Sequence, residues 1–145
     1  MRSAEFTGTS AGVLPDNAIR AMLNTGAIRA TPEVLPAQVQ PASLDLRLGT
    51  TAYRIRASFL TGQGQKVADR LEEFEMHSFS LDGGAVLEKG AVYVVPLMES
   101  LALPPEITAV ANAKSSTGRL DLLTRTITDG GVEFDRIPAG YTGPL

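Results

Sequence analysis

The sequence of 145 residues contains no cysteine and a single histidine, His77. Without cysteine the chain has no disulfide framework, no thiolate nucleophile and no cysteine-based zinc site. One histidine excludes metal sites built from several histidines and leaves little basis for a serine–histidine–aspartate triad. His77 has no second histidine or cysteine nearby, so we expect no metal-ligand role for it.

Long apolar runs and clusters of positive charge are also missing. The longest uncharged apolar stretch near the middle, residues 90–98, is far shorter than the roughly 20 residues of a transmembrane helix. A net charge of −3 without any run of Lys or Arg argues against nucleic acid as a partner. The sequence therefore predicts no membrane span and no nucleic-acid binding, and a cytoplasmic location is the default. Small anionic ligands are compatible with this charge, because a few local cations suffice.

The length and composition indicate one globular domain. Hydrophobic residues make up 43% of the chain and charged residues 20%, which suits a modest buried core. Residues 1–12, MRSAEFTGTSAG, are small and polar without an apolar segment, so we expect a disordered leader or a cloning remnant there. We expect residues 13–145 to form the domain.

One helix is well defined by its pattern, in LPDNAIRAMLNTG. Asp16 is placed to cap it, the apolar residues at 19, 22 and 23 share one face, and Gly26 is placed to end it. The next stretch, AIRATPEVLPAQVQP, carries three prolines. We expect an extended crossing without regular structure there.

The remaining chain predicts strands. SLDLRLG places leucines at 44, 46 and 48 opposite the polar residues at 43, 45 and 47, which is typical of a half-buried strand that Gly49 closes. TAYRIRA repeats the alternation, so the two stretches are expected to form a hairpin across Gly49 and Thr50. KVADRLEEFEMHSFSL fits either a helix or an irregular insertion. Four more runs, AVLEKG, AVYVVPLMESLALP, EITAVANA and LDLLTRTI, are separated by Gly and Pro, which indicates an all-β sandwich or barrel.

Two serine hydroxyls and two cations gather around Gly118 in AKSSTGRLDLL. We predict a short helix that begins near Ser115 or Ser116, with a serine as its cap and free N–H groups facing outward. Lys114 and Arg119 would lie beside the serines, and such a group suits a phosphate. Local physics alone favours the simpler alternative, a solvated helix cap. A nucleotide P-loop is excluded, because Ala113 stands where that motif needs glycine.

Other charged residues have a functional and a plain interpretation. Asp45 and Arg47, on the polar face of the first predicted strand, suit either a ligand or subunit contact or simple solvation. The carboxylates of Asp129, Glu133 and Asp135 follow in TDGGVEFDR, where a general base is possible but solvent-exposed acids are common.

Three of these stretches together resemble the dCTP deaminase family, within the superfamily that also holds the dUTPases. LPDNAIRAMLNTGAI resembles the opening helix of that family, QPASLDLRLG its first strand motif, and AKSSTGRLDL its R/K-S-S-x-x-R-L-G-L nucleotide motif. The resemblance runs from Leu14 to Leu145 and is strongest to the longer, two-part members. It implies a mainly β fold, a dUTPase-like distorted β-barrel or jelly roll with a short N-terminal helix and one short helix after the Ser-Ser motif. It also implies that the sequence is an N-terminal portion and that the barrel is incomplete at its C-terminus, since FDRIPAGYTGPL ends in turn chemistry.

The resemblance implies hydrolytic deamination of dCTP to dUTP and ammonia, in a homotrimer with active sites between subunits. dTTP is a candidate regulator, Mg²⁺ travels with the triphosphate, and no zinc is needed. Zinc deaminases use H-x-E and P-C-x-x-C, which a chain without cysteine cannot supply. The alternatives are a dUTP diphosphatase, which shares the barrel and the serine motif, and a non-catalytic nucleotide-binding barrel.

The resemblance also assigns roles to residues around the nucleotide motif. Lys114 and Ser116 are expected to contact the triphosphate, while Ser115 and Arg119 are expected to position the chemistry at the base. No residue of the chain is assigned to a metal.

The resemblance assigns roles to four further residues. Asp45 and Arg47 are expected to support the site and the trimer, and Arg136 and Tyr141 in FDRIPAGYTG to contact the nucleotide. The general base of the family is a Glu on the strand that follows this segment, which is expected beyond Leu145.

Overall fold

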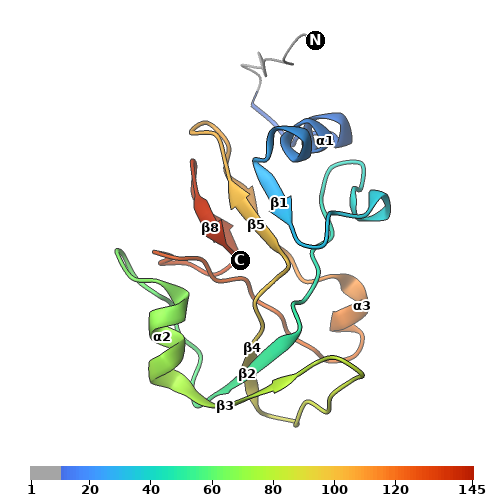
Figure 1. The fold of residues 1–145 in the computed structure, drawn as a ribbon. Helices are drawn as coiled ribbons and strands as arrows, with labels where there is room; N and C mark the ends of the chain where they lie inside the picture. The colour runs from blue at the N-terminus through green and yellow to red at the C-terminus, as the bar shows by residue number, and fades with distance from the viewer. Residues whose placement is uncertain (1–10) are drawn as a thin grey trace.

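A computed structural model describes residues 11–145 of the chain, and the expected leader lies almost wholly outside these described residues. Figure 1 shows two three-stranded antiparallel sheets, one in the upper and one in the lower half of the molecule, joined by long extended segments. A short two-stranded sheet completes the β structure of residues 11–145. The elements, in order, are α1 (Asp16–Thr25), β1 (Ile28–Ala30), η1 (Pro36–Gln38), β2 (Thr51–Ile55), α2 (Val67–Phe74), β3 (Glu75–Ser80), β4 (Val92–Val94), β5 (Glu99–Ala102), β6 (Ala109–Val110), α3 (Ser115–Gly118), β7 (Arg136–Ile137) and β8 (Thr142–Pro144).

Helix α1 forms where the apolar spacing predicts it. Ile19 and Met22 are buried on one face, and Gly26 ends the helix in the left-handed conformation, with φ of 77°. The expected cap is wrong, because Pro15 occupies the N-cap position and Asp16 is the first helical residue. The Asp16 carboxylate lies 3.6 Å from Arg20, one turn further along.

The upper sheet, in the order β1-β5-β8, packs with α1 around the larger apolar core. Residues of β1 pair with residues of β5 from Ile28 opposite Leu101 to Ala30 opposite Glu99. The expectation of an irregular crossing after α1 is therefore wrong in part: a strand precedes the first proline, and the 3₁₀ turn η1 begins at Pro36.

The lower sheet, in the order β3-β2-β4, packs against α2. TAYRIRA forms β2 as predicted, and the ambiguous stretch after it forms α2 followed directly by β3. The second core joins Ile55, Phe59 and Leu71, and the ring of Phe59 stacks on that of Phe74 with centroids 5.2 Å apart.

The predicted strand at 43–49 is extended chain held by isolated bridges, Val39 to Leu44 and Leu48 to Leu97. The expected hairpin is wrong, because β2 pairs with β3 and β4 instead. The expected sides are also wrong: Leu48 is 57% exposed, whereas Arg47 turns toward the buried Glu99. Gly49 is needed where it stands, because a Cβ there would meet the carbonyl oxygen of Pro96 at 2.6 Å.

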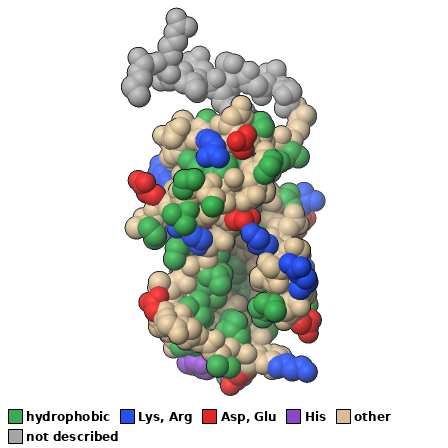
Figure 2. Space-filling view, turned by 90° about the vertical axis from the view of Figure 1, so that its right-hand side faces the viewer, with side chains coloured by type: hydrophobic (Ala, Val, Ile, Leu, Met, Phe, Trp, Pro, Cys, Tyr) green, Lys and Arg blue, Asp and Glu red, His purple; other side chains and the backbone are tan. Residues whose placement is uncertain are grey.

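The stretches AVLEKG and LDLLTRTI, predicted as strands, have no regular structure. The second of them follows α3 and leaves Leu120 and Leu123 largely exposed. Figure 2 shows the side of the molecule on which α3 lies, where positive and negative side chains meet at mid-height and apolar side chains remain uncovered. Among residues 11–145, no helix has the length and apolar character that crossing a bilayer requires.

Candidate functional site

Helix α3 is the short helix predicted after the Ser-Ser motif. It spans four residues, Lys114 occupies its N-cap position, and no side chain caps it. The serine cap is therefore a wrong prediction, and the turn is closed instead by Thr117, whose hydroxyl donates to the Lys114 carbonyl at 2.6 Å. One turn is too short for a strong helix dipole. Any anion binding at this position must rely on side chains.

Lys114 and Asp45 form an ion pair that joins two of the predicted site segments. The Lys114 ammonium donates to the Asp45 carboxylate at 2.5 Å, across 69 residues of sequence. The Lys114 side chain is 64% exposed, so the pair adds little to folding stability. An ammonium group has three donors, and one bond to Asp45 leaves two of them for a ligand.

Ser115, Ser116 and Arg119 lie beside this pair on the same turn, and all three are exposed. Within residues 11–145, none of their side chains has a hydrogen-bond partner in the protein. The four residues of the predicted nucleotide motif therefore place two serine hydroxyls and two cations on the exposed surface of one turn. Such a set can bind phosphate oxygens through charge-assisted hydrogen bonds.

Behind Asp45 lies a buried polar network centred on Glu99 in β5, which is only 1% exposed. Its Oε1 accepts from Arg47 Nε at 2.8 Å and from Gln38 Nε2 at 2.9 Å, and its Oε2 accepts from the Arg47 amide at 2.8 Å. Burial alone raises the pKa of Glu99, but the hydrogen bonds from Arg47 and Gln38 and the charge of Arg47 outweigh it. The pKa is thus lowered, and Glu99 is charged at neutral pH.

Gln38 and Arg47 connect this network to the surface pair. Gln38 Nε2 also donates to the Asp45 carbonyl at 2.8 Å, and the Arg47 guanidinium donates to the Pro32 carbonyl at 2.7 Å. The side chain of Arg47, which was predicted to support the site, therefore makes its hydrogen bonds to other residues of the protein. Reasoning from the sequence missed Gln38 and Glu99, although Glu99 is a lone acid within the apolar run PLMESLALP.

Arg136 and Tyr141 lie in different surroundings from the α3 turn. Arg136 is exposed and pairs with Glu133 at 3.2 Å. Tyr141 is buried in the larger core, where its hydroxyl donates to the Pro144 carbonyl at 2.6 Å and accepts from the Asp129 amide at 3.2 Å. Burial raises the pKa of Tyr141. This placement gives Tyr141 a structural role, and its expected contact with a nucleotide stays a prediction.

The three carboxylates considered as general bases are each engaged. Asp129 accepts from the Val67 amide at 2.8 Å at the start of α2, and Asp135 binds Arg125 and the Thr126 amide. Glu133 is exposed in its pair with Arg136. None of the three is held against the α3 turn by a hydrogen bond in the described residues.

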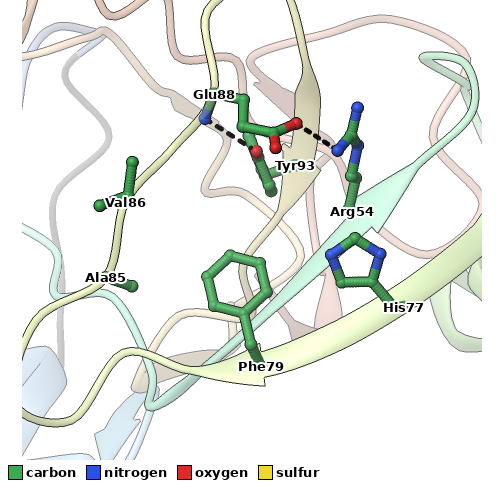
Figure 3. A pocket seen from close by; sticks show the side chains of 7 residues that line it. All are labelled: Arg54, His77, Phe79, Ala85, Val86, Glu88 and Tyr93. Atoms are coloured by element: carbon green, nitrogen blue, oxygen red, sulfur yellow. Dashed lines mark hydrogen bonds and ion pairs between the residues drawn. The ribbon is translucent and has the colours of Figure 1, made fainter.

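The lower sheet carries an open pocket of about 200 Å³, drawn in Figure 3. Its lining residues are Arg54, His77, Phe79, Ala85, Val86, Glu88 and Tyr93. The pocket is smaller than usual ligand sites, and its one arginine is paired with Glu88. It contains none of the predicted site residues. In the described part of the chain, no group of three His, Cys, Asp or Glu side chains could hold a metal ion.

Comparison with known proteins agrees with the motif trio. Residues 10–145 match the family model described as the 2'-deoxycytidine 5'-triphosphate deaminase N-terminal domain. A curated protein of Kocuria rhizophila, named dCTP deaminase, dUMP-forming, is 32% identical over 114 residues, which cover 79% of this chain and 58% of that protein. This chain therefore spans little more than half the length of that relative.

A solved structure confirms the predicted mainly β, dUTPase-like fold. The crystal structure of 2'-deoxycytidine 5'-triphosphate deaminase from Agrobacterium tumefaciens superposes with a TM-score of 0.88 at 58% identity. The match covers 92% of this chain and 40% of that chain. Together the motifs, the fold and the family match show that this chain belongs to the dCTP deaminase family, as an N-terminal portion of it.

Proposed function

We propose that the protein carrying this chain deaminates dCTP by hydrolysis, and that the α3 turn holds the triphosphate. The observation that carries the proposal is the exposed set Lys114, Ser115, Ser116 and Arg119, of which Lys114 is paired with Asp45, in a member of the dCTP deaminase family. The resemblance assigned these same residues to the nucleotide. Lys114 and Ser116 bind phosphate oxygens, and Ser115 and Arg119 orient the groups around the cytosine ring.

In this reaction a water molecule adds across the C4–N3 bond of the cytosine, and a general base carries one proton of the water to N3. The hydroxyl of the tetrahedral intermediate then gives its proton to the amino group, which leaves as ammonia, so that C4 becomes a carbonyl and N3 keeps its proton. Orientation of the water and the ring contributes much of the rate acceleration in reactions of this kind. We assign the general base to a Glu on the strand that follows this segment in the family. The contacts of Asp129 and Asp135 support this, because both carboxylates are used elsewhere.

Further parts of the proposal concern the assembly and the metal. We propose a cytoplasmic homotrimer with active sites between subunits, and dTTP as a regulator. The exposed leucines next to α3 support such a contact. Mg²⁺ would arrive as part of the Mg–dCTP substrate. The only carboxylate bound at the α3 turn, Asp45, is engaged by Lys114 in the described residues, so phosphate oxygens and water are the ligands available to the ion.

The test is deamination of dCTP by the full-length protein in the presence of Mg²⁺, followed by ammonia release and by the change from cytosine to uracil absorbance. Ser115→Ala and Arg119→Ala should each lower kcat/KM by about 100-fold or more, because both are expected to position the reacting groups. Matched controls are Ser58→Ala and Arg20→Ala, which remove an exposed hydroxyl and an exposed cation away from α3. Folded protein without dCTP turnover, or full activity in both α3 variants, would show that the assignment is wrong. Binding of dCTP or dTTP without any product would favour the non-catalytic barrel.

A second candidate differs in the product. The name of the Kocuria rhizophila relative, dCTP deaminase, dUMP-forming, favours an enzyme that also hydrolyses the triphosphate to dUMP and pyrophosphate. Chromatography of the reaction products distinguishes dUTP from dUMP. A dUTP diphosphatase without deaminase activity would convert dUTP and leave dCTP unchanged.

A further inference from the structure

The network of Gln38, Glu99 and Arg47 ends at the residue that orients Lys114. We propose that Gln38 and Glu99 are positioning residues that set Lys114 for the triphosphate of the substrate, acting through the backbone of residues 45–47 and the carboxylate of Asp45. The inference rests on the proposed function, because it takes Lys114 as a phosphate contact. Neither Gln38 nor Glu99 is exposed, so neither can touch the nucleotide directly.

Glu99 is a charged side chain that is almost completely buried. A buried ion pair usually contributes little net stability compared with apolar residues of the same size. Glu99 nevertheless stands within an apolar run and makes three hydrogen bonds, two of them to Arg47. A Glu99–Arg47 pair of this kind is better explained by the geometry it imposes than by the stability it adds.

The backbone of residues 45–47 lacks a regular strand partner. Gln38 and Asp45 exchange two hydrogen bonds, from the Asp45 amide to the Gln38 carbonyl at 2.8 Å and from Gln38 Nε2 to the Asp45 carbonyl at 2.8 Å. The Arg47 amide donates to Glu99, and the Arg47 carbonyl accepts from the Met98 amide at 2.9 Å. The buried side chains of Gln38 and Glu99 thus make hydrogen bonds to this backbone that a neighbouring strand would make in a regular sheet.

Asp45 connects this network to Lys114. With its backbone fixed on both sides, Asp45 presents its carboxylate to the Lys114 ammonium at one place. A lysine side chain has many rotamers, and a ligand that binds an already oriented ammonium loses less conformational freedom. The network therefore prepares Lys114 for a phosphate group without touching that group.

The experiment is a double-mutant cycle on the full-length protein, read by calorimetric binding of inorganic triphosphate and of dCTP. Glu99→Gln should weaken triphosphate binding about tenfold in the parent and less than about twofold in a Lys114→Met background. Glu99→Gln keeps the size of the side chain but loses the charge that holds Arg47. A merely structural role would weaken binding by the same factor in both backgrounds, and that result would overturn the proposal.

Gln38→Met provides a second cycle should Glu99→Gln fail to fold, because it removes the bonds to Glu99, the Asp45 carbonyl and the Leu35 amide and introduces an apolar side chain of similar length. The same dependence on Lys114 is expected. The control is Glu106→Gln, which neutralises an exposed carboxylate and should leave triphosphate binding unchanged in both backgrounds. Binding of inorganic triphosphate distinguishes the two proposals. If the effect of Glu99→Gln on this binding depends on Lys114 but the protein does not turn over dCTP, the positioning role is supported and the deaminase is contradicted. If the protein turns over dCTP but the effect does not depend on Lys114, the deaminase is supported and the positioning role is contradicted.

Discussion

Arg47 and Glu99 show how a contact between distant residues overrides a local pattern. The alternation in SLDLRLG predicts Arg47 on a solvated face, yet its guanidinium lies against a carboxylate 52 residues further along the chain. The alternation of apolar and polar residues in a sequence predicts which residues share a face, but it does not identify the partner that a buried charge requires. The sequence predicts that Lys114 and Asp45 belong to one site, but it does not predict the contact between them.

The charge on Glu99 should make the stability of the fold sensitive to acid. The folded-state pKa of Glu99 lies below its ordinary value of 4.5, so the carboxylate contributes stability that is fully present above pH 4.5 and is lost as pH falls through the folded-state pKa. We expect the urea midpoint of the parent to fall steeply below that pH. Glu99→Gln should start lower and fall less, whereas Glu106→Gln should follow the parent. Parallel curves for the parent and Glu99→Gln would contradict this assignment of the acid sensitivity.

Among the elements, α1 and β2 could be predicted because their signals are local: an apolar face that ends at a glycine, and a strict alternation. The position of helix α3 was predicted correctly, but the predicted serine cap was wrong. The segment at 43–49 and the run LDLLTRTI were wrongly predicted as strands, because most of their leucines are exposed rather than packed on a sheet. Whether such a run forms a strand depends on a partner strand, which its own residues do not specify.

Helix α2 illustrates this dependence on distant residues. Its N-cap residue, Lys66, provides no capping side chain, and the Val67 amide is bound instead by the carboxylate of Asp129, 62 residues away in sequence. The residues on either side of Asp129 also hold residues 61–65. The Thr61 hydroxyl donates to the Thr128 carbonyl, and the Gly130 amide donates to the Gln65 carbonyl. The acid that the sequence offered as a candidate general base thus acts as a long-range helix cap.

Asp129→Ala should therefore lower the free energy of unfolding by about 1 kcal/mol, the usual cost of removing a capping oxygen. Asp129→Asn is the matched control, since its amide oxygen can still accept from the Val67 amide and should retain most of the stability. Urea unfolding followed by circular dichroism measures both. Equal losses in the two variants would show that the charge of Asp129, and not its role as an acceptor, stabilises α2.

At the scale of the whole molecule, the fold could be predicted through the family resemblance, whereas the division into two small sheets with separate cores could not. The resemblance was carried by three short motifs, and these lie on α1, on the extended chain before β2, and on α3. Two of the motifs meet in the Lys114–Asp45 pair. The third, α1, packs in the larger core beside the sheet that carries Glu99, and its Asp16 amide donates to the Pro41 carbonyl at 2.9 Å.

Several exposed apolar residues follow α3 in the chain. Leu123 is 89% exposed in the single chain, and Leu120 and Leu122 beside it are also uncovered. A surface on which exposed apolar side chains are grouped is more often a contact surface than a surface that stays in water. In the proposed trimer, with active sites between subunits, these leucines would lie next to the triphosphate-binding turn.

Leu123→Asp should therefore reduce the molar mass of the full-length protein from three subunits toward one, because a carboxylate buried in an apolar contact has no partner. Light scattering measures the mass, and dCTP turnover should fall with it, while the circular dichroism spectrum stays that of the parent. Val86→Asp is the control, since Val86 is equally exposed but lines the pocket on the lower sheet. A trimer that survives Leu123→Asp would place the subunit contact elsewhere and separate the active site from the leucines after α3.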